Sequence, residues 1–195
     1  MHEDPPTDPG RAPRGGARAL TRALERLGLR SPEQRAWALY DWANSAFFTT
    51  VVAAVFPVYY RSVAAAGRSD VIETYASASS YSMLAVALLG PLLGALADVA
   101  GCKKLLLAVF VALGVLATAG LFFVGEGDWL AGCWLFALGN VGVAGSFIFY
   151  DALLPSLARD DELDRVSSAA FSLGYLGGGL LLVLNVACIL RPEWF

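Results

Sequence analysis

Residues 76–124 read ASASSYSMLAVALLGPLLGALA, then DVAGCKK, then LLLAVFVALGVLATAGLFFV, which is two apolar stretches on either side of a short charged turn. An α-helix needs about 20 residues to cross a hydrocarbon core of about 30 Å, because each residue adds about 1.5 Å. Each apolar stretch reaches that length. The sequence therefore predicts two membrane-spanning helices joined by a tight turn.

The same pattern continues on both sides of this pair. Apolar segments alternate with short charged turns, and the chain is 57% hydrophobic and 16% charged, against about 45–50% and 25% in soluble domains. A spanning segment must satisfy its backbone hydrogen bonds internally. We therefore expect an all-α polytopic membrane protein with five transmembrane helices, at about residues 36–60, 76–97, 105–124, 129–150 and 167–190.

The composition argues against several other classes of protein. The three cysteines are scattered singly, and His2 is the single histidine of the sequence, so neither a disulfide framework nor a metal site is expected. Lys and Arg number 14 against 17 Asp and Glu, which does not favour a nucleic-acid surface. Ser45 and Ser146, which lie in spanning segments, have no obvious general base in sequence reach. We expect no enzyme, no cofactor and no metal.

Residues 1–35 form a basic tail before the first spanning segment. This tail is rich in proline and glycine, holds seven arginines and lacks the apolar core of a signal peptide. We expect it to be disordered through Gly16. Within residues 17–29, three leucines and three arginines fall on separate sides of a helix: Leu20, Leu24, Leu27, Arg18, Arg22 and Arg26. The segment is either an amphipathic helix on an anionic leaflet or a solvated tail.

The basic residues also predict the orientation of the chain. The tail, the turn at residues 98–104 and the loop at residues 151–166 hold eleven of the 14 Lys and Arg, and the other side holds three. Loops rich in Lys and Arg face the cytoplasm. The N-terminus is therefore predicted to be cytoplasmic.

Asp41 lies inside the first apolar segment, with Asn44 three residues further on and Tyr40 beside it. Positions three apart share a helix face, and an ionisable group at membrane depth costs at least about 2.5 kcal/mol unless it is paired or wet. One interpretation is a substrate or proton site in which Asn44 orients Asp41. The other is that Asp41 reaches the headgroups or caps a neighbouring helix.

The turn after the second segment is the most informative part of the sequence. Gly90, Gly94 and Asp98 recur every four residues, so two small residues permit close helix packing below a carboxylate. Gly101 allows a tight turn, and Lys103 and Lys104 follow it. We expect Asp98 to pair with a cation or with a helix N-terminus and to act as a conformational latch.

This turn resembles the loop signature between helices two and three of the major facilitator superfamily. The matching residues are Gly94, Leu96, Asp98, Gly101 and Lys103, whereas Val99 and Cys102 replace basic residues of the usual pattern. That departure argues against any charge relay that uses an Arg directly after the Asp.

Three further motifs resemble the vacuole-effluxer family within that superfamily. They are YDWANSAF at residues 40–47, FYDALLP at 149–155 leading to RVSS at 165–168, and GYLGGG at 174–179. The resemblance implies a secondary transporter of amino acids or similar small solutes in a bacterial plasma membrane or a vacuolar membrane. In such a transporter, the intramembrane carboxylate of Asp41 makes the proton a candidate coupling ion.

The family fold implied by the resemblance is two six-helix bundles with the substrate path between them. The five predicted helices correspond to most of the N-terminal bundle. We therefore expect a partner bundle, either in the rest of a longer protein or through self-association. A five-helix assembly or interaction protein that does not transport is the alternative.

Glycines mark the fourth and fifth segments as packing helices. Gly139, Gly142 and Gly145 surround Asn140, which either bonds to a neighbouring helix or touches substrate. In the fifth segment, Gly174 and Gly178 form a small-residue ridge. A nucleotide-binding loop is excluded in the fourth segment, because no strand precedes these glycines and no lysine follows at phosphate spacing.

The charged loop before the fifth segment offers one further pair. Asp151 and Arg165 lie at its two ends, so they are candidates for a cytoplasmic gate that holds the fourth and fifth helices together. The other interpretation is an ordinary solvated turn.

Overall fold

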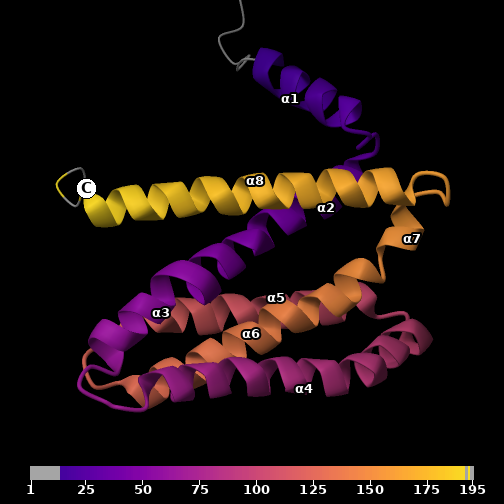
Figure 1. Ribbon diagram of the computed structural model, residues 1–195. Helices are drawn as coiled ribbons and strands as arrows, with labels where there is room; N and C mark the ends of the chain where they lie inside the picture. The colour runs from indigo at the N-terminus through magenta and orange to yellow at the C-terminus, as the bar shows by residue number, and fades with distance from the viewer. Residues whose placement is uncertain (1–13, 192, 194–195) are drawn as a thin grey trace, which may run out of the picture.

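The computed structural model describes residues 14–191 and 193, and all regular secondary structure in that part of the chain is helical (Figure 1). The elements are α1 (Arg14–Arg26), α2 (Pro32–Ala46), η1 (Phe47–Ala54), α3 (Val55–Tyr59), η2 (Tyr60–Ala64), α4 (Val71–Ala100), α5 (Lys103–Gly120), η3 (Leu121–Phe123), α6 (Trp129–Asp151), α7 (Leu154–Leu157) and α8 (Leu163–Leu190). Of these, η1 and η2 are π-helices and η3 is a 3-10 helix.

Within the described residues, five helical stretches are long and apolar enough to cross a membrane, which confirms the predicted all-α polytopic fold. They are Pro32–Ala64, Val71–Ala100, Lys103–Phe123, Trp129–Asp151 and Leu163–Leu190. Several begin earlier than predicted because their first turns are polar. The first span, for example, starts at Pro32 rather than near residue 36, since Ser31 and Gln34 form a capping box at its N-terminus.

The first span is not a uniform α-helix. Its middle, η1, and its last turn, η2, are π-helical, and the short α-helix α3 lies between them. Pro57 lies in α3 and has no N–H to donate to the preceding turn. π-Helical turns are rare and occur frequently at functional sites.

The spans alternate in direction, so the bundle has two ends. We call the end with the starts of α2, α5 and α8 the near end, and the end with the starts of α4 and α6 the far end. Figure 1 shows α8 and α4 on opposite sides of the bundle. The first span runs obliquely between them, beside α8 at the near end and close to the start of α4 at the far end.

The packing pairs have a pattern that fits an inverted repeat. Among the spans, α2 packs on α8, α4 packs on α6, and α5 packs on α6. Both members of the α2–α8 pair run from near to far, and both members of the α4–α6 pair run from far to near. If the first span (α2) corresponds to the fourth (α6) and the second (α4) to the fifth (α8), the α2–α8 pair corresponds to the α6–α4 pair. The corresponding helices run in opposite directions, as expected for repeats of inverted topology.

Glycines permit the closest of these contacts. A methyl group at Gly142 would overlap the backbone of Gly114 in α5, and one at Gly145 would overlap the ring of Phe110. Gly139 lies against Phe47 of the first span. Gly90 and Gly94 both lie against Ile148 of α6, which is how α4 and α6 approach one another.

Two aromatic clusters fill the ends of the bundle. At the near end, the Trp37 and Tyr150 rings stack with centroids 4.3 Å apart, and Trp37 Nε1 donates to the Tyr150 carbonyl at 3.0 Å. At the far end, Phe136 stacks on Tyr75 at 4.5 Å and on Phe56 at 5.5 Å. These clusters join the first span to α6 at both ends.

The tail contributes one helix. The predicted amphipathic helix at residues 17–29 is present as α1, which starts earlier, at Arg14, and ends at Arg26. Disorder through Gly16 stays a prediction: α1 begins at Arg14, and residues 1–13 lie outside the described residues. Leu24 and Leu29 are buried in the near-end cluster, whereas Leu20 and Leu27 are exposed.

Candidate functional site

Asp41 is the buried carboxylate of the first span. Its side chain is 4% exposed, and no donor in the described part of the chain forms a hydrogen bond or ion pair with it. The carboxylate lines a pocket of about 260 Å³ between the first span and α8. A charged group without a partner at membrane depth is expected to serve a ligand or a proton rather than stability.

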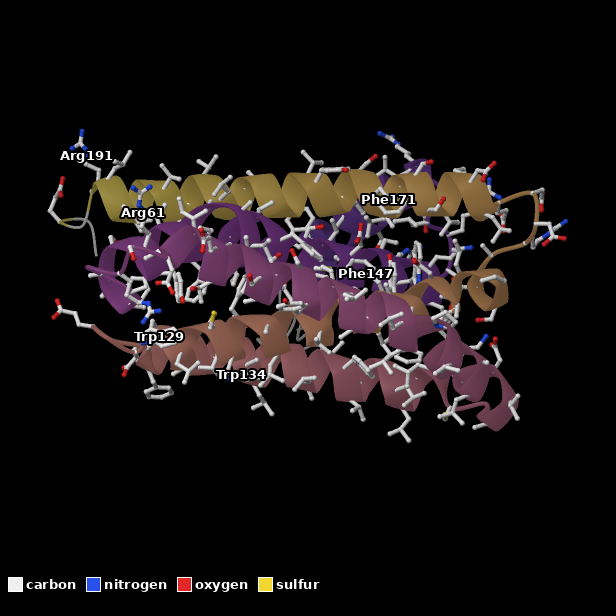
Figure 2. All side chains as sticks on the ribbon, turned by 60° about the horizontal axis from the view of Figure 1, so that its bottom comes forward. Arg61, Trp129, Trp134, Phe147, Phe171 and Arg191 are labelled. Carbon is white, nitrogen blue, oxygen red and sulfur yellow. The ribbon has the colours of Figure 1, made fainter. Side chains whose placement is uncertain are left out.

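Aromatic side chains form much of the wall around Asp41. Phe48 comes from the first span, Phe147 from α6, and Phe171 and Tyr175 from α8. Figure 2 labels Phe147 and Phe171, two of these four residues. A carboxylate beside aromatic faces is suited to a small cation such as an amino group, because both attract positive charge.

Gly174 makes room for this arrangement. A Cβ at Gly174 would lie 2.5 Å from Asp41 Oδ2 and 2.8 Å from Ser45 Oγ. One turn further along α8, the Gly178 carbonyl accepts a 3.2 Å hydrogen bond from Thr49 Oγ1 in the π-helix η1. The predicted glycine ridge of α8 thus holds α8 against the polar side of the first span.

The structure does not bring Asp41 and Asn44 together. Asn44 lines a separate cavity of about 600 Å³, together with Tyr40, Ser146 and Thr118, on the side of the first span that faces α5 and α6. Positions three apart in a helix differ by about 60°, which is enough to place them on either flank of α2. Tyr40 Oη lies 2.5 Å from Ser146 Oγ, so Tyr40 too points toward α6.

Two amide side chains stay unsatisfied inside the bundle. Asn140 is fully buried, and neither its Nδ2 nor its Oδ1 has a hydrogen-bond partner among the described residues. The Nδ2 of Asn44 is also buried without a hydrogen-bond partner among the described residues. The expected interhelical hydrogen bond of Asn140 is therefore not formed, and an unpaired buried amide costs about 1–3 kcal/mol.

The predicted switch loop contains a set of contacts between Asp98, Lys103 and the Ala152 carbonyl, which we call the near-end tie. Gly101 ends α4 in the left-handed region, at φ +63°. Lys103 Nζ then lies 2.6 Å from Asp98 Oδ1 and donates to the Ala152 carbonyl at 3.2 Å. One lysine thus joins the end of α4, the start of α5 and the end of α6. Lys104 is exposed and takes no part in these contacts.

The structure does not join Asp151 to Arg165. Arg165 Nη2 lies 2.9 Å from Glu162 Oε1, one turn away in the same loop and helix, and Glu162 also lies 3.6 Å from Arg30 Nη1. The Asp151–Arg165 pair, one of the two interpretations of this loop, is thus not formed, and Arg165 pairs locally because residues 162 and 165 face the same side of the chain at i, i+3 spacing.

Sequence analysis did not single out Phe147, Phe171 or Thr49. Aromatic and threonine residues are ordinary in spanning helices, so nothing in the local pattern separates a pocket wall from a lipid contact. The GYLGGG motif was the one sequence feature that pointed to this pocket, because its glycines Gly174 and Gly178 allow α8 to lie close against the first span.

Comparison with known proteins gives a consistent assignment. Residues 70–193 match the family model described as "Vacuole effluxer Atg22 like". The chain is 39% identical over 166 residues to an uncharacterized MFS-type transporter of Bacillus subtilis strain 168, YxiO. That alignment covers 83% of this chain and 38% of the relative, so the chain spans well under two thirds of the length of this relative. No solved structure matches the chain.

Proposed function

Because the chain belongs to the vacuole effluxer Atg22-like family, we propose that it serves in a secondary transporter that moves small solutes by alternating access. The family assignment and the five membrane-spanning helices support an integral membrane protein. Within the proposal, the solutes are amino acids and the coupling ion is the proton. The N-terminus and the near end face the cytoplasm of a bacterial cell, or the corresponding side of a vacuolar membrane.

The observation that carries this proposal is the Asp41 pocket. Its buried carboxylate and Ser45 hydroxyl lie in a small recess between the first span and α8 whose walls are mainly aromatic. Amino acids carry an ammonium group that such a recess can bind, and a proton can take the same position when the solute leaves. One carboxylate then serves both solute and proton in turn. Asn140 and Asn44 supply further amides for a solute that reaches the bundle interior.

The tie at the near end is the proposed conformational switch. Asp98, Lys103 and the Ala152 carbonyl link three helices through one ammonium group, and both ionic partners remain accessible to water. Such a contact can form and break at little cost as helices rock, since exposed ion pairs contribute only about 0–1 kcal/mol. The rocking takes place against a second bundle, which belongs to the same protein or to another copy.

A transport assay tests this function. The protein is purified from the membrane in which it is made, so that any second bundle is kept, and is placed in liposomes. With an imposed pH gradient, the liposomes are expected to accumulate at least one labelled amino acid, and a protonophore should abolish the accumulation. Protein-free liposomes serve as the control. If the folded protein moved no amino acid under any gradient, the alternative of a non-transporting helix assembly would replace this proposal.

A further inference from the structure

Arg61 and Arg68, two arginines at the far end of the bundle, lie in contrasting environments. Arg68 is fully engaged, because its Nε and Nη2 donate to Asp70 at 3.0 and 2.6 Å, and its guanidinium lies 3.8 Å from the centroid of the Trp129 ring. These hydrogen bonds hold the pKa of the Asp70 carboxyl below its ordinary value. Arg61 is exposed, and no residue in the described part of the chain forms an ion pair or hydrogen bond with its guanidinium.

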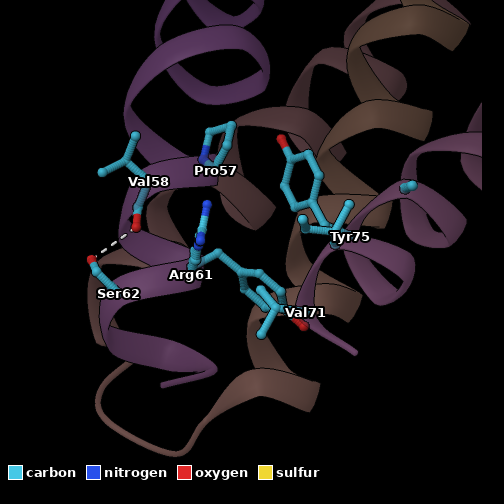
Figure 3. Close-up of a pocket in the computed structure, with 9 residues that line it drawn as sticks. Pro57, Val58, Arg61, Ser62, Val71 and Tyr75 are labelled. Carbon is cyan, nitrogen blue, oxygen red and sulfur yellow. Dashed lines mark hydrogen bonds between the residues drawn. The ribbon is translucent and has the colours of Figure 1, made fainter. Parts of the chain in front are cut away.

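Arg61 lies at the edge of an apolar pocket between η2 and α4. The pocket has a volume of about 580 Å³. Figure 3 shows Pro57 and Val58 on one side, Val71 and Tyr75 on the other, and the Arg61 side chain between them. The hydroxyl of Tyr75 donates to the Val52 carbonyl at 2.9 Å, so the ring presents an apolar face.

Two features place this pocket at a membrane surface. Figure 2 shows Arg61, Trp129 and Arg191 at the same end of the bundle, and tryptophan and arginine gather where spanning helices leave the hydrocarbon. Val58 and Ile72, which line the pocket, are 66% and 70% exposed. In a spanning helix, apolar side chains with such exposure are suited to contact with acyl chains.

We propose that this pocket binds one anionic phospholipid of the far-side leaflet. The phosphate of the lipid pairs with the Arg61 guanidinium, and an acyl chain occupies the apolar pocket between η2 and α4. Charge complementarity carries the assignment: Arg61 is a free cation whose neighbours in the pocket are almost all apolar, and a phospholipid joins an anion to a hydrocarbon chain. A guanidinium binds phosphate oxygens in a bidentate manner. This inference does not depend on the transport function.

Lipid retention by the purified protein tests the proposal. The protein is delipidated in detergent and given phosphatidylglycerol, and bound lipid is counted by native mass spectrometry. Arg61→Ala removes the cation, and Ala76→Phe fills the pocket from an exposed position on α4. Arg61→Ala is expected to lower the fraction of protein that carries one lipid by about tenfold because a charge-assisted contact is lost. Ala76→Phe is expected to lower that fraction to a similar extent because its ring occupies the space of the acyl chain.

Two matched variants control for general effects of charge and bulk. Arg159→Ala removes an arginine whose side chain is 82% exposed at the near end. Ser77→Phe adds a ring at an exposed position next to Ala76 but outside the pocket. Both should retain phosphatidylglycerol as the unmodified protein does. Thermal unfolding of each variant confirms that it is folded before lipid is added.

Three results would overturn the proposal. The first is undiminished retention by Arg61→Ala and Ala76→Phe. The second is displacement of the lipid by excess inorganic phosphate, if this displacement requires Arg61 and is the same in Ala76→Phe as in the unmodified protein. That result would assign Arg61 to the binding of a soluble anion. The third is that the unmodified protein binds no lipid and that Ala76→Phe no longer associates with a second helix bundle. That result would show that the pocket contacts another protein surface.

Discussion

Asp41 owes its position to a residue that has no side chain. Gly174 lies opposite it on α8, and a methyl group there would come within 2.5 Å of Asp41 Oδ2 and 2.8 Å of Ser45 Oγ. The carboxylate is the movable partner, because it is the end of a side chain rather than backbone. The glycine therefore determines where the negative charge lies in the pocket.

We predict that Gly174→Ala displaces Asp41 and slows transport. A shift of about 1 Å in a binding group can reduce rates by up to about a hundredfold, so we expect amino-acid uptake to fall by about 10- to 100-fold. Gly179→Ala is the matched control, because no atom lies within 4 Å of a Cβ at Gly179. Uptake rates and thermal unfolding are measured for both variants. Equal uptake by the two would show that Gly174 does not position the site.

Single residues differ in how well sequence alone can identify them. Asp41 was predicted as a site residue because a carboxylate stands out within an apolar segment, and the structure places it in a pocket. The link from Asp41 to Asn44 was not found, because a spacing of three puts side chains on two flanks as readily as on one face. Phe147 and Phe171 carry no local signal, since their role depends on which helices meet.

At the scale of elements, the turn between α4 and α5 is where a small contact joins three helices. Lys103 reaches Asp98 at 2.6 Å and the Ala152 carbonyl at 3.2 Å. The side chains of Lys103 and Asp98 are 31% and 62% exposed, so water competes for both charges. A contact of this kind adds little stability but can decide the relative population of two helix arrangements.

We predict that Asp98→Ala slows turnover and leaves solute affinity unchanged. The maximal uptake rate should fall by up to about fivefold, equivalent to at most about 1 kcal/mol in the barrier, because the near-end tie no longer favours one state. Equilibrium binding of the solute should stay the same, since Asp98 does not line the Asp41 pocket. Asp161→Ala, at an exposed near-end carboxylate, is the control. Lost binding with unaltered turnover would contradict this role.

The elements were easier to predict than their internal geometry. Apolar length located all five spans, but their starts shifted where polar first turns, such as Pro32 to Arg35, precede the apolar residues. The π-helices η1 and η2 were not predicted, because the pattern of apolar residues in the first span is equally compatible with an α-helix. Pro57 is the visible mark of this irregularity in the sequence.

At the scale of the whole molecule, the structure shows which helices pack on one another, which the sequence alone did not predict. The pairing of α2 with α8 and of α4 with α6 is set by contacts between residues far apart in the chain, such as Thr49 with Gly178. These pairings place Asp41 at the seam between the first and last spans. The family resemblance implied a helix bundle without its pairings, and hydropathy alone fixes only the number and length of the spans.

The most direct test of the central claim is amino-acid uptake by Asp41→Asn, measured in liposomes over a range of pH. Asp164→Asn, at an exposed carboxylate in the first turn of α8, is the matched control. The account predicts that Asp41→Asn lowers uptake by at least about tenfold, as loss of a charged binding partner requires, and removes its dependence on the pH gradient. Full uptake by Asp41→Asn with an unchanged pH dependence would contradict the account.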